Sequence, residues 1–311
     1  MELQQLRYVV AVAETGGFTR AAERCLVVQS ALSHQIAKLE RELGARLFER
    51  TSRRVRLTAA GEAFLPAARQ SLKAAERARA EVAAATGEIR GRLTVGAIGT
   101  ITAVDIPALL GAYRARHPQV GVNLWTGRSE GLADDVRTAT VDLAFLGVQP
   151  GFETPGLRSA TLVVDRHVAV VAPGHPLAAD PEAADPRGVT LARLAREVFV
   201  DWVAGTVARA QTEEAFAAAG LRRAVAFEVS SMDYIAGLVR HGLAVALLPS
   251  GLVPRLDGLR VLPVRDGPAR EERLVWHPDR LSPAAGAFLT AARAARVTPP
   301  PAAPEPGPAA T

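Results

Sequence analysis

The segment from Phe18 to Thr58 constrains the fold of this chain more than any other part of it. Two short helical patterns meet there at a tight turn, and a basic segment follows at once. The second pattern begins at about Gln29 or Ser30 and continues to Glu40. Its apolar residues, spaced along one helical face, are Ala31, Leu32, Ile36 and Leu39. This order of elements predicts a winged helix-turn-helix, a unit suited to duplex DNA.

Two earlier helical patterns supply the rest of this small unit. Thr19 is expected to cap the helix that precedes the turn. The apolar face of that helix carries Ala21, Ala22 and Leu26. A further apolar stripe lies upstream and consists of Leu3, Leu6, Val10 and Ala13. A helix with this stripe can close the core against the other two.

The candidate DNA-contacting residues lie on the polar face of the second helix and in the segment after it. Leu47–Glu49 and Val55–Leu57 are expected to form a two-stranded wing. Five arginines and one glutamate occur between Arg46 and Arg56. Such a run is often only a solvated basic loop, but its place directly after a recognition-helix pattern favours DNA. The expected contacts to base edges and phosphates are Gln29, Ser30, Ser33, His34, Lys38, Arg50, Arg53 and Arg54.

The charge of the chain supports this interpretation. Of 37 Lys and Arg and 32 Asp and Glu residues, 15 and 10 lie in residues 1–90, which leaves 22 of each in the remainder. The formal net charge of +5 therefore belongs to the N-terminal part alone. Because Lys and Arg gain affinity for nucleic acid by neutralising phosphates, the asymmetry suggests a DNA-binding module joined to a body with another task.

Composition excludes several classes of protein. No run approaches 18 apolar residues, so we expect no membrane span, and the N-terminus lacks the pattern of a secretory signal. Cys25 is the only cysteine, which rules out an internal disulfide or a cysteine zinc site, and it is expected to be a small core residue. The histidines show no metal-ligand spacing. We expect a cytoplasmic protein on the bacterial nucleoid, without metal or cofactor.

A long helix is predicted from Thr58 to about Glu88. An apolar residue recurs there every three or four positions, at Phe64, Ala68, Leu72, Ala75 and Val82. One thin stripe with many small residues favours a dimerisation arm over a solitary surface helix. Pro66 lies inside this helix and is expected to kink it.

The residues after Arg92 alternate between strand and helix patterns, which predicts an α/β body with a mainly parallel sheet. The expected strands are 93–98, 120–125, 141–146, 168–172, 198–201, 224–229 and 244–248. The expected helices are 105–117, 132–139, 206–219, 232–241 and 283–296, of which the last should pack on the first half of the body. The length fits two units. A proline-rich tail follows and is expected to be disordered.

Over nearly its whole length the chain resembles LysR-type transcriptional regulators. The specific motif is LRYVVAVAETGGFTRAAERCLVVQSALSHQIAKLERELGARLFERTSRRVRLTAAG, and weaker ones are VDLAFLG and GLAVALLP. The resemblance implies a winged helix-turn-helix in residues 1–58, with its core at about 18–37, and a linker helix in 59–88. It further implies a two-lobed, periplasmic-binding-protein-like effector domain in 91–298, followed by the tail at 299–311. Lobe 1 would comprise about 91–162 and 266–298, and lobe 2 about 163–265.

The same resemblance implies a function and partners. The expected protein is a homotetramer, or a dimer at least, that binds and bends double-stranded promoter DNA, contacts RNA polymerase and responds to a small metabolite. Two departures from the family pattern matter. Val28 stands where the family usually has serine, so Ser30 would have to cap the recognition helix. His34 stands where arginine is frequent, which is expected to shift the base preference.

One motif in the body favours a different class of protein. Residues 127–131 read Gly-Arg-Ser-Glu-Gly between a strand and a helix, which is the setting of a hydrolase nucleophile elbow. Asp142 and His167 follow as candidate triad partners. The alternative is therefore a serine hydrolase that uses Ser129, or a solute-binding protein, with a fused DNA-binding domain. Too few strand–helix units precede the motif for that fold, and Ser129 has a simpler role as a helix cap.

The binding interpretation uses loops at the carboxyl ends of the strands, where helix N-termini offer free amides to anions. The candidate effector contacts on these loops are Thr100, Ile101, Thr102, Arg128, Ser129, Trp202, Ser230, Ser231 and Met232. Arg128 is the candidate partner for a carboxylate. Each hydroxyl alone is more often a plain helix cap, and Trp202 fits packing between the lobes equally well. Their joint position favours a site for a small anion.

Overall fold

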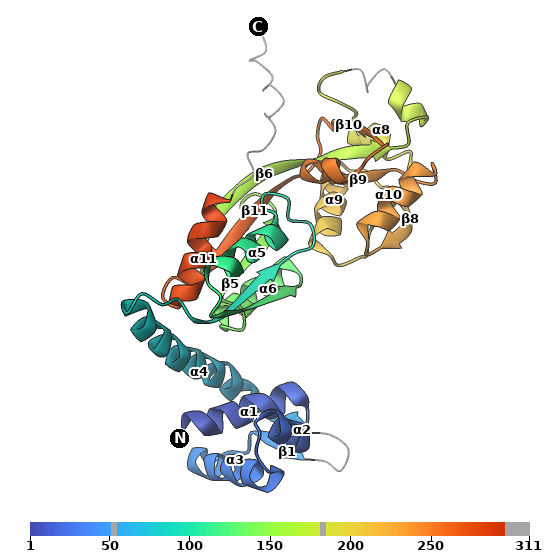
Figure 1. Cartoon of the computed structure of the whole chain (residues 1–311). Coiled ribbons are helices and arrows are strands. Elements are labelled where there is room, and N and C mark those ends of the chain that lie inside the picture. Colours follow the sequence, from blue (N-terminus) through green and yellow to red (C-terminus); the bar gives the residue numbers. More distant parts are fainter. Residues whose placement is uncertain (51–54, 181–184, 296–311) are drawn as a thin grey trace.

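The computed structural model describes residues 1–50, 55–180 and 185–295 of the 311-residue chain. A small helical N-terminal part is followed by one long helix and a larger α/β body (Figure 1). Arg53 and Arg54 lie outside the described residues, as does the proline-rich tail.

The N-terminal part consists of three helices and a two-stranded wing. The elements are α1 (Leu3–Thr15), α2 (Phe18–Arg24), α3 (Gln29–Leu43), β1 (Phe48–Arg50) and β2 (Val55–Leu57). Leu32, Ile36 and Leu39 of α3 are fully buried, together with residues of α1 and α2. The winged helix-turn-helix expected from the sequence is therefore present.

Several details of this part differ from the sequence predictions. Helix α2 begins at Phe18 with Gly17 as its N-cap, so Thr19 lies inside the helix. Leu26 is 93% exposed because it occupies the turn with a positive φ of 55°. Leu3 and Ala31 are also exposed. Helix α3 begins after Val28 with no side-chain cap within the described chain, so Ser30 does not replace the missing serine.

The linker helix α4 (Ala59–Ala85) is continuous through Pro66. Its N-cap is Thr58, whose hydroxyl oxygen accepts from the amide of Gly61 at 3.0 Å. Gly61 is required here, because a Cβ atom would lie 2.1 Å from the carbonyl oxygen of Leu47. Phe64 packs against the core of the N-terminal part. Phe64, which was expected on the stripe of a dimerisation arm, is therefore used inside one chain, whereas Val82 of the same stripe is 69% exposed.

The body has two lobes, which we define by their elements. Lobe 1 contains β3 (Gly91–Ala97), α5 (Ile106–Arg116), β4 (Val120–Thr126), α6 (Ser129–Arg137), β5 (Leu143–Val148) and α11 (Pro283–Ala294). Lobe 2 contains η1 (Pro176–Ala179), α8 (Leu191–Leu194), β7 (Val198–Trp202), α9 (Val207–Ala218), β8 (Ala224–Val229), α10 (Met232–Arg240), β9 (Ala246–Pro249), η2 (Ser250–Arg255) and β10 (Arg260–Leu262). As expected, α11 packs on lobe 1 and buries Phe288 in its core.

Two long strands, β6 (Arg158–Val171) and β11 (Ala269–Trp276), run from one lobe to the other (Figure 1). They lie side by side in a sheet of order β10-β6-β11-β5-β3-β4, in which β9 also pairs with β6. The pairs β3–β4, β3–β5 and β7–β8 are parallel, but β6 and β11 are antiparallel to each of their partners. The expected mainly parallel sheet is therefore wrong at these crossing strands. Within the described ranges no helix is long and apolar enough to span a bilayer.

Candidate functional site

Helix α3 lies on the side of the N-terminal part that is farther from the body (Figure 1), and one of its faces is polar and exposed. Gln29, Ser30, His34 and Lys38 are exposed on it, and Ser33 is half-buried. The opposite face of α3 is anchored by its three buried aliphatic side chains. A helix that is held on one side and polar on the other can enter the major groove without disturbing its own core.

Two contacts orient α3 against α1, and the sequence did not predict them. The amide of Gln5, which is buried, donates to Gln35 at 3.2 Å. Gln35 therefore faces α1 and not the outer surface. Lys38 lies 3.6 Å from the carboxylate of Glu2, and both side chains are more than half exposed. Such an exposed pair is weak, so Lys38 stays available to a phosphate.

The wing is fastened to α3 by a carboxylate. Glu40 accepts from the amides of Leu47 at 2.8 Å and Phe48 at 3.2 Å. The ring of Phe48 then packs edge-on against Phe18 of α2, with 5.7 Å between centroids. Arg50 ends β1 at the start of the wing turn. The wing is thus placed beside the recognition helix, but the side chain of Arg50 and all of Arg53 and Arg54 fall outside the part that the structure describes.

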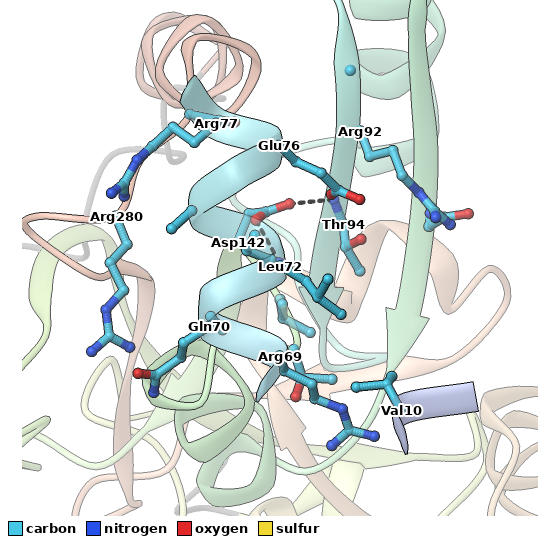
Figure 2. Close-up of a pocket in the computed structure, with 18 of the residues that line it drawn as sticks. Val10, Arg69, Gln70, Leu72, Glu76, Arg77, Arg92, Thr94, Asp142 and Arg280 are labelled. Atoms are coloured by element: carbon cyan, nitrogen blue, oxygen red, sulfur yellow. Dashed lines mark hydrogen bonds and ion pairs between the residues drawn. The ribbon is translucent and has the colours of Figure 1, made fainter. Parts of the chain in front are cut away.

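A cavity of about 1370 Å³ lies where α1, α4 and lobe 1 meet (Figure 2). Lys73 of α4 donates to the carboxylate of Asp142 at 2.7 Å, and the same carboxylate accepts from the amide of Thr94 at 2.7 Å. One turn further along α4, Arg77 donates to the carbonyl oxygen of Asp279 at 3.0 Å. Helix α4 is therefore tied to the first strand of lobe 1, a contact that no sequence motif indicated.

The loop that contains Thr100, Ile101 and Thr102 is engaged by an internal ion cluster. Both the amide and the hydroxyl of Thr102 donate to the carboxylate of Glu272, at 2.9 Å and 2.8 Å. The guanidinium of Arg270 donates to the carbonyl oxygen of Thr100 at 2.9 Å and to its hydroxyl at 3.1 Å. Ile101 is buried. In this state the amides expected to bind an anionic ligand bind a carboxylate of the chain itself.

The cluster also reaches lobe 2. Arg270 and Glu272 lie on β11 and form an ion pair at 2.5 Å. On β6, the carboxylate of Asp165 lies 3.7 Å from Arg270 and accepts from the amides of Ser250 and Gly251, both at 3.1 Å. All three charged side chains are almost fully buried. The cluster therefore connects a loop of lobe 1 with the start of η2 through the two crossing strands.

His167 lies next to this cluster as a neutral group. Its Nδ1 is 3.1 Å from the carbonyl oxygen of Pro268, and its Nε2 is buried with no partner among the described residues. Burial, aided by the charge of Arg270, lowers the pKa of His167 to about 4. The imidazole of His167 is therefore neutral at neutral pH.

Ser129 does not have the geometry of a nucleophile. Its side chain is completely buried, and its hydroxyl donates to the carbonyl oxygen of Gly147 at 3.0 Å and accepts from the Gly147 amide at 3.2 Å. Arg128 is the N-cap of α6, so the expected capping role of Ser129 is also wrong. Asp142 is bonded to Lys73, and His167 lies on β6. The serine-hydrolase alternative therefore has no support.

The other candidate effector residues are distributed over both lobes. Arg128 is exposed, and its Nη1 lies 3.6 Å from where a Cβ on Gly205 of lobe 2 would stand. Trp202 and Met232 pack on the same apolar cluster of lobe 2. Ser231 caps α10 by accepting from the Asp233 amide at 3.2 Å, and Ser230 is exposed. The structure thus brings Arg128 to lobe 2 but leaves Ser231 in the ordinary role of a helix cap.

Comparisons with known families agree with this architecture. Residues 3–62 match the family model described as bacterial regulatory helix-turn-helix protein, lysR family, and residues 86–296 match the LysR substrate binding domain. The transcriptional dual regulator GltC of Bacillus subtilis is 34% identical over 249 residues, which cover 80% of this chain and 81% of GltC. The RuBisCO operon transcriptional regulator of Allochromatium vinosum is 31% identical over 93% of this chain and 94% of its own length.

Solved structures show the same fold. A full-length OxyR variant from Pseudomonas aeruginosa superposes with a TM-score of 0.74 at 27% identity, covering 97% of this chain and 99% of that one. CbnR in complex with its target DNA superposes with a TM-score of 0.62 at 24% identity, covering 95% of this chain and all of CbnR. At that identity the second likeness concerns the fold alone.

Proposed function

This chain belongs to the LysR family of DNA-binding transcriptional regulators, and from that premise we propose which residues read DNA, what it senses and how copies of it assemble. The observation that carries the proposal is the exposed polar face of α3 above a fully buried aliphatic face. Gln29, Ser30, Ser33 and His34 contact base edges in the major groove. Phosphates are held by Lys38 of α3 and by Arg50, Arg53 and Arg54 of the wing.

Substitutions on α3 test this division of labour. His34→Ala is expected to change the preferred base at one position of a selected binding site, by about 1–3 kcal/mol of discrimination. Lys38→Ala should weaken binding to specific and random duplexes alike and lower the slope of log affinity against log salt by about one unit. Both are measured by fluorescence anisotropy across a salt series. Equal losses on both duplexes for both variants would refute the assignment.

The proposed effector is a small anionic metabolite bound between the lobes. Its proposed contacts are Thr100, Ile101, Thr102, Arg128, Trp202, Ser230, Ser231 and Met232, and Ser129 is proposed to support the site from behind. Two features favour an anion: the amides of the Thr102 loop already hold a carboxylate, and the Arg128 guanidinium is exposed. Because Ser129 is buried, it acts through the backbone of Gly147 and not by direct contact. A ligand of this kind shifts the lobes only as far as its affinity differs between their arrangements.

The proposed assembly is a dimer through α4, with two dimers forming a tetramer on promoter DNA. The exposed Val82 and the small residues of α4 support helix-on-helix contact. We further propose contact with RNA polymerase and a location on the bacterial nucleoid. We also propose that the chain is not an enzyme, which is consistent with the names of GltC and the RuBisCO operon regulator as transcriptional regulators. The proposed division is 1–58, 59–88 and 91–298, with lobe 2 at about 163–265.

A further inference from the structure

Gln211 is a buried polar residue whose hydrogen bonds are not accounted for. Its side chain is only 3% exposed, and its Nε2 has no partner within the described part of the chain. An unpaired buried amide destabilises a folded protein, so a position like this one needs an explanation. The buried Arg223 differs, because its guanidinium stacks 5.1 Å and 5.4 Å from the ring centres of Phe199 and Phe216.

The two faces of α9 show where Gln211 is directed. Arg209, Thr212 and Phe216 share one face and contact the interior of lobe 2, where Thr212 bonds to Asp201 at 3.1 Å. Gln211 lies about 100° away from Thr212 around the helix and on the same side as Glu214, three residues later. Glu214 accepts a hydrogen bond from Gln149, which follows β5 of lobe 1. Gln211 therefore lies at the border of the face that carries Glu214, because Ala215, four residues later, packs on the core of lobe 2.

Contacts between the lobes bracket this position. At the N-terminal end of α9, Arg128 of lobe 1 lies beside Gly205. At its middle, Gln149 of lobe 1 bonds to Glu214. Gln211 is located between these two points along the helix, and it offers an N–H donor. A carboxylate bound by Arg128 and an acceptor bound by Gln211 would both be inside the proposed ligand site.

We propose that Gln211 is a recognition residue of the effector site. Its Nε2 donates to a hydrogen-bond acceptor of a small carboxylate whose acid group is held by Arg128. This inference rests on the proposed function, since it specifies the ligand of the same site. It explains why an amide occupies a buried place where an apolar side chain would be more stable: the donor is satisfied only when the ligand is bound. It also requires that the ligand carry an acceptor besides its carboxylate.

Replacing the amide by an apolar side chain of similar length tests the inference. In the ligand-free full-length protein, Gln211→Met should raise the melting temperature by about 2 °C, because an unpaired buried group is removed. The matched control, Gln119→Met at an exposed position, should leave it unchanged. A lower melting temperature for Gln211→Met would show that the amide has a structural partner and would overturn the proposal.

Ligand binding supplies the second measurement. The probes are the linear dicarboxylates from malonate to adipate and the hydroxybenzoates, titrated into the full-length protein by calorimetry. At least one should bind the wild type, and Gln211→Met and Arg128→Met should each weaken it about tenfold or more. Binding of none, or unchanged affinity in Gln211→Met, would overturn the proposal. The regulator assignment is tested separately: carboxylate binding through Gln211 without any affinity for duplex DNA would refute that assignment alone.

Discussion

At the scale of single residues, the carboxylate of Glu272 decides what the loop of Thr102 can bind. It accepts from the amides of Thr102 and Ala103 and pairs with Arg270. An anionic ligand at this loop must displace a group that is already well matched. Arg128 is exposed, and its guanidinium has no carboxylate partner among the described residues. Recognition of the acid group is therefore expected to begin at Arg128.

The buried imidazole of His167 makes stability depend on pH. In the folded protein the pKa of His167 is about 4, below the ordinary 6.5. Between pH 4 and pH 6.5 the unfolded chain therefore binds a proton at this imidazole that the folded chain does not. The free energy of unfolding should therefore fall as the pH is lowered from 6.5 towards 4, by an amount on the order of 3 kcal/mol. In His167→Gln the free energy of unfolding should decrease less between pH 6.5 and pH 4, as measured by urea unfolding across the pH series. The exposed His241→Gln is the control, and an identical pH slope for both variants would contradict the argument.

The hydroxyl of Ser129 is expected to be structural. Ser129→Ala leaves the amide and carbonyl of Gly147 without their partner in a buried place, which should cost about 1–3 kcal/mol in unfolding free energy. Ser230→Ala, at an exposed position, should change stability by no more than about 0.5 kcal/mol. A fluorophosphonate probe should not label the wild type. Labelling at Ser129 would restore the hydrolase interpretation.

At the scale of elements, α4 joins the two functional parts. Its first turns pack on the N-terminal core through Phe64, and its middle bonds to lobe 1 through Lys73. Asp142, the partner of Lys73, also bonds to β3, the strand that leads to the loop of Thr100. A movement of that loop has a continuous path of packed backbone to α4.

The exposed side of α4 predicts self-association. A fragment of residues 1–88 keeps the N-terminal core and the whole helix, and it should sediment as a dimer that still binds duplex DNA. Val82→Glu in this fragment, at a position that is 69% exposed, should shift it towards monomer because a charge would be buried in the contact. A fragment that is monomeric at every concentration would contradict the proposed dimer.

The elements also show which parts of the fold a sequence can reveal. Strand β8 spans 224–229 as expected, and helices α9 and α10 are confirmed over nearly the expected residues. The apolar face of α10 is buried, whereas α9 buries Arg209, Gln211 and Thr212 beside Phe216. Strand β11 was missed because Arg270, Glu271 and Glu272 follow its first residue, Ala269, and three successive charges suggest a loop. In the structure two of these are buried as an ion pair. The two buried charges are stabilised by residues distant in sequence, such as Asp165 and Thr102. A local sequence pattern gives no information about such contacts.

Some features of the candidate sites could be predicted from the local sequence, and others could not. The exposure of Gln29 and His34 follows from the spacing of three aliphatic residues on α3, so local periodicity was sufficient. The engagement of Thr100 and Thr102 by β11 was not predictable, because 170 residues separate each bonded pair. Gln211 lay in a helix that was predicted, but its burial depends on how α9 meets lobe 1.

At the scale of the whole molecule, the chain combines a DNA-reading part with a ligand-binding body through one helix. Residues 1–90, which comprise the N-terminal part and α4, hold the entire net charge, and the body contains two lobes that meet at α9 and at the crossing strands. A dimer related by a twofold axis would present two copies of α3 to DNA. Its preferred site should therefore be an inverted repeat, with half-sites separated by about one helical turn or a multiple of it.

The central claim, that this chain is a sequence-specific DNA-binding protein that reads DNA with α3, is tested most directly by selection from random duplexes. Full-length protein should enrich an inverted repeat, and it should bind that repeat about 10³-fold or more tightly than a scrambled duplex at physiological salt. The same selection with His34→Ala should enrich a repeat that differs at one position in each half-site. If no motif is enriched over the random pool, or if His34→Ala selects the same repeat, the account is contradicted.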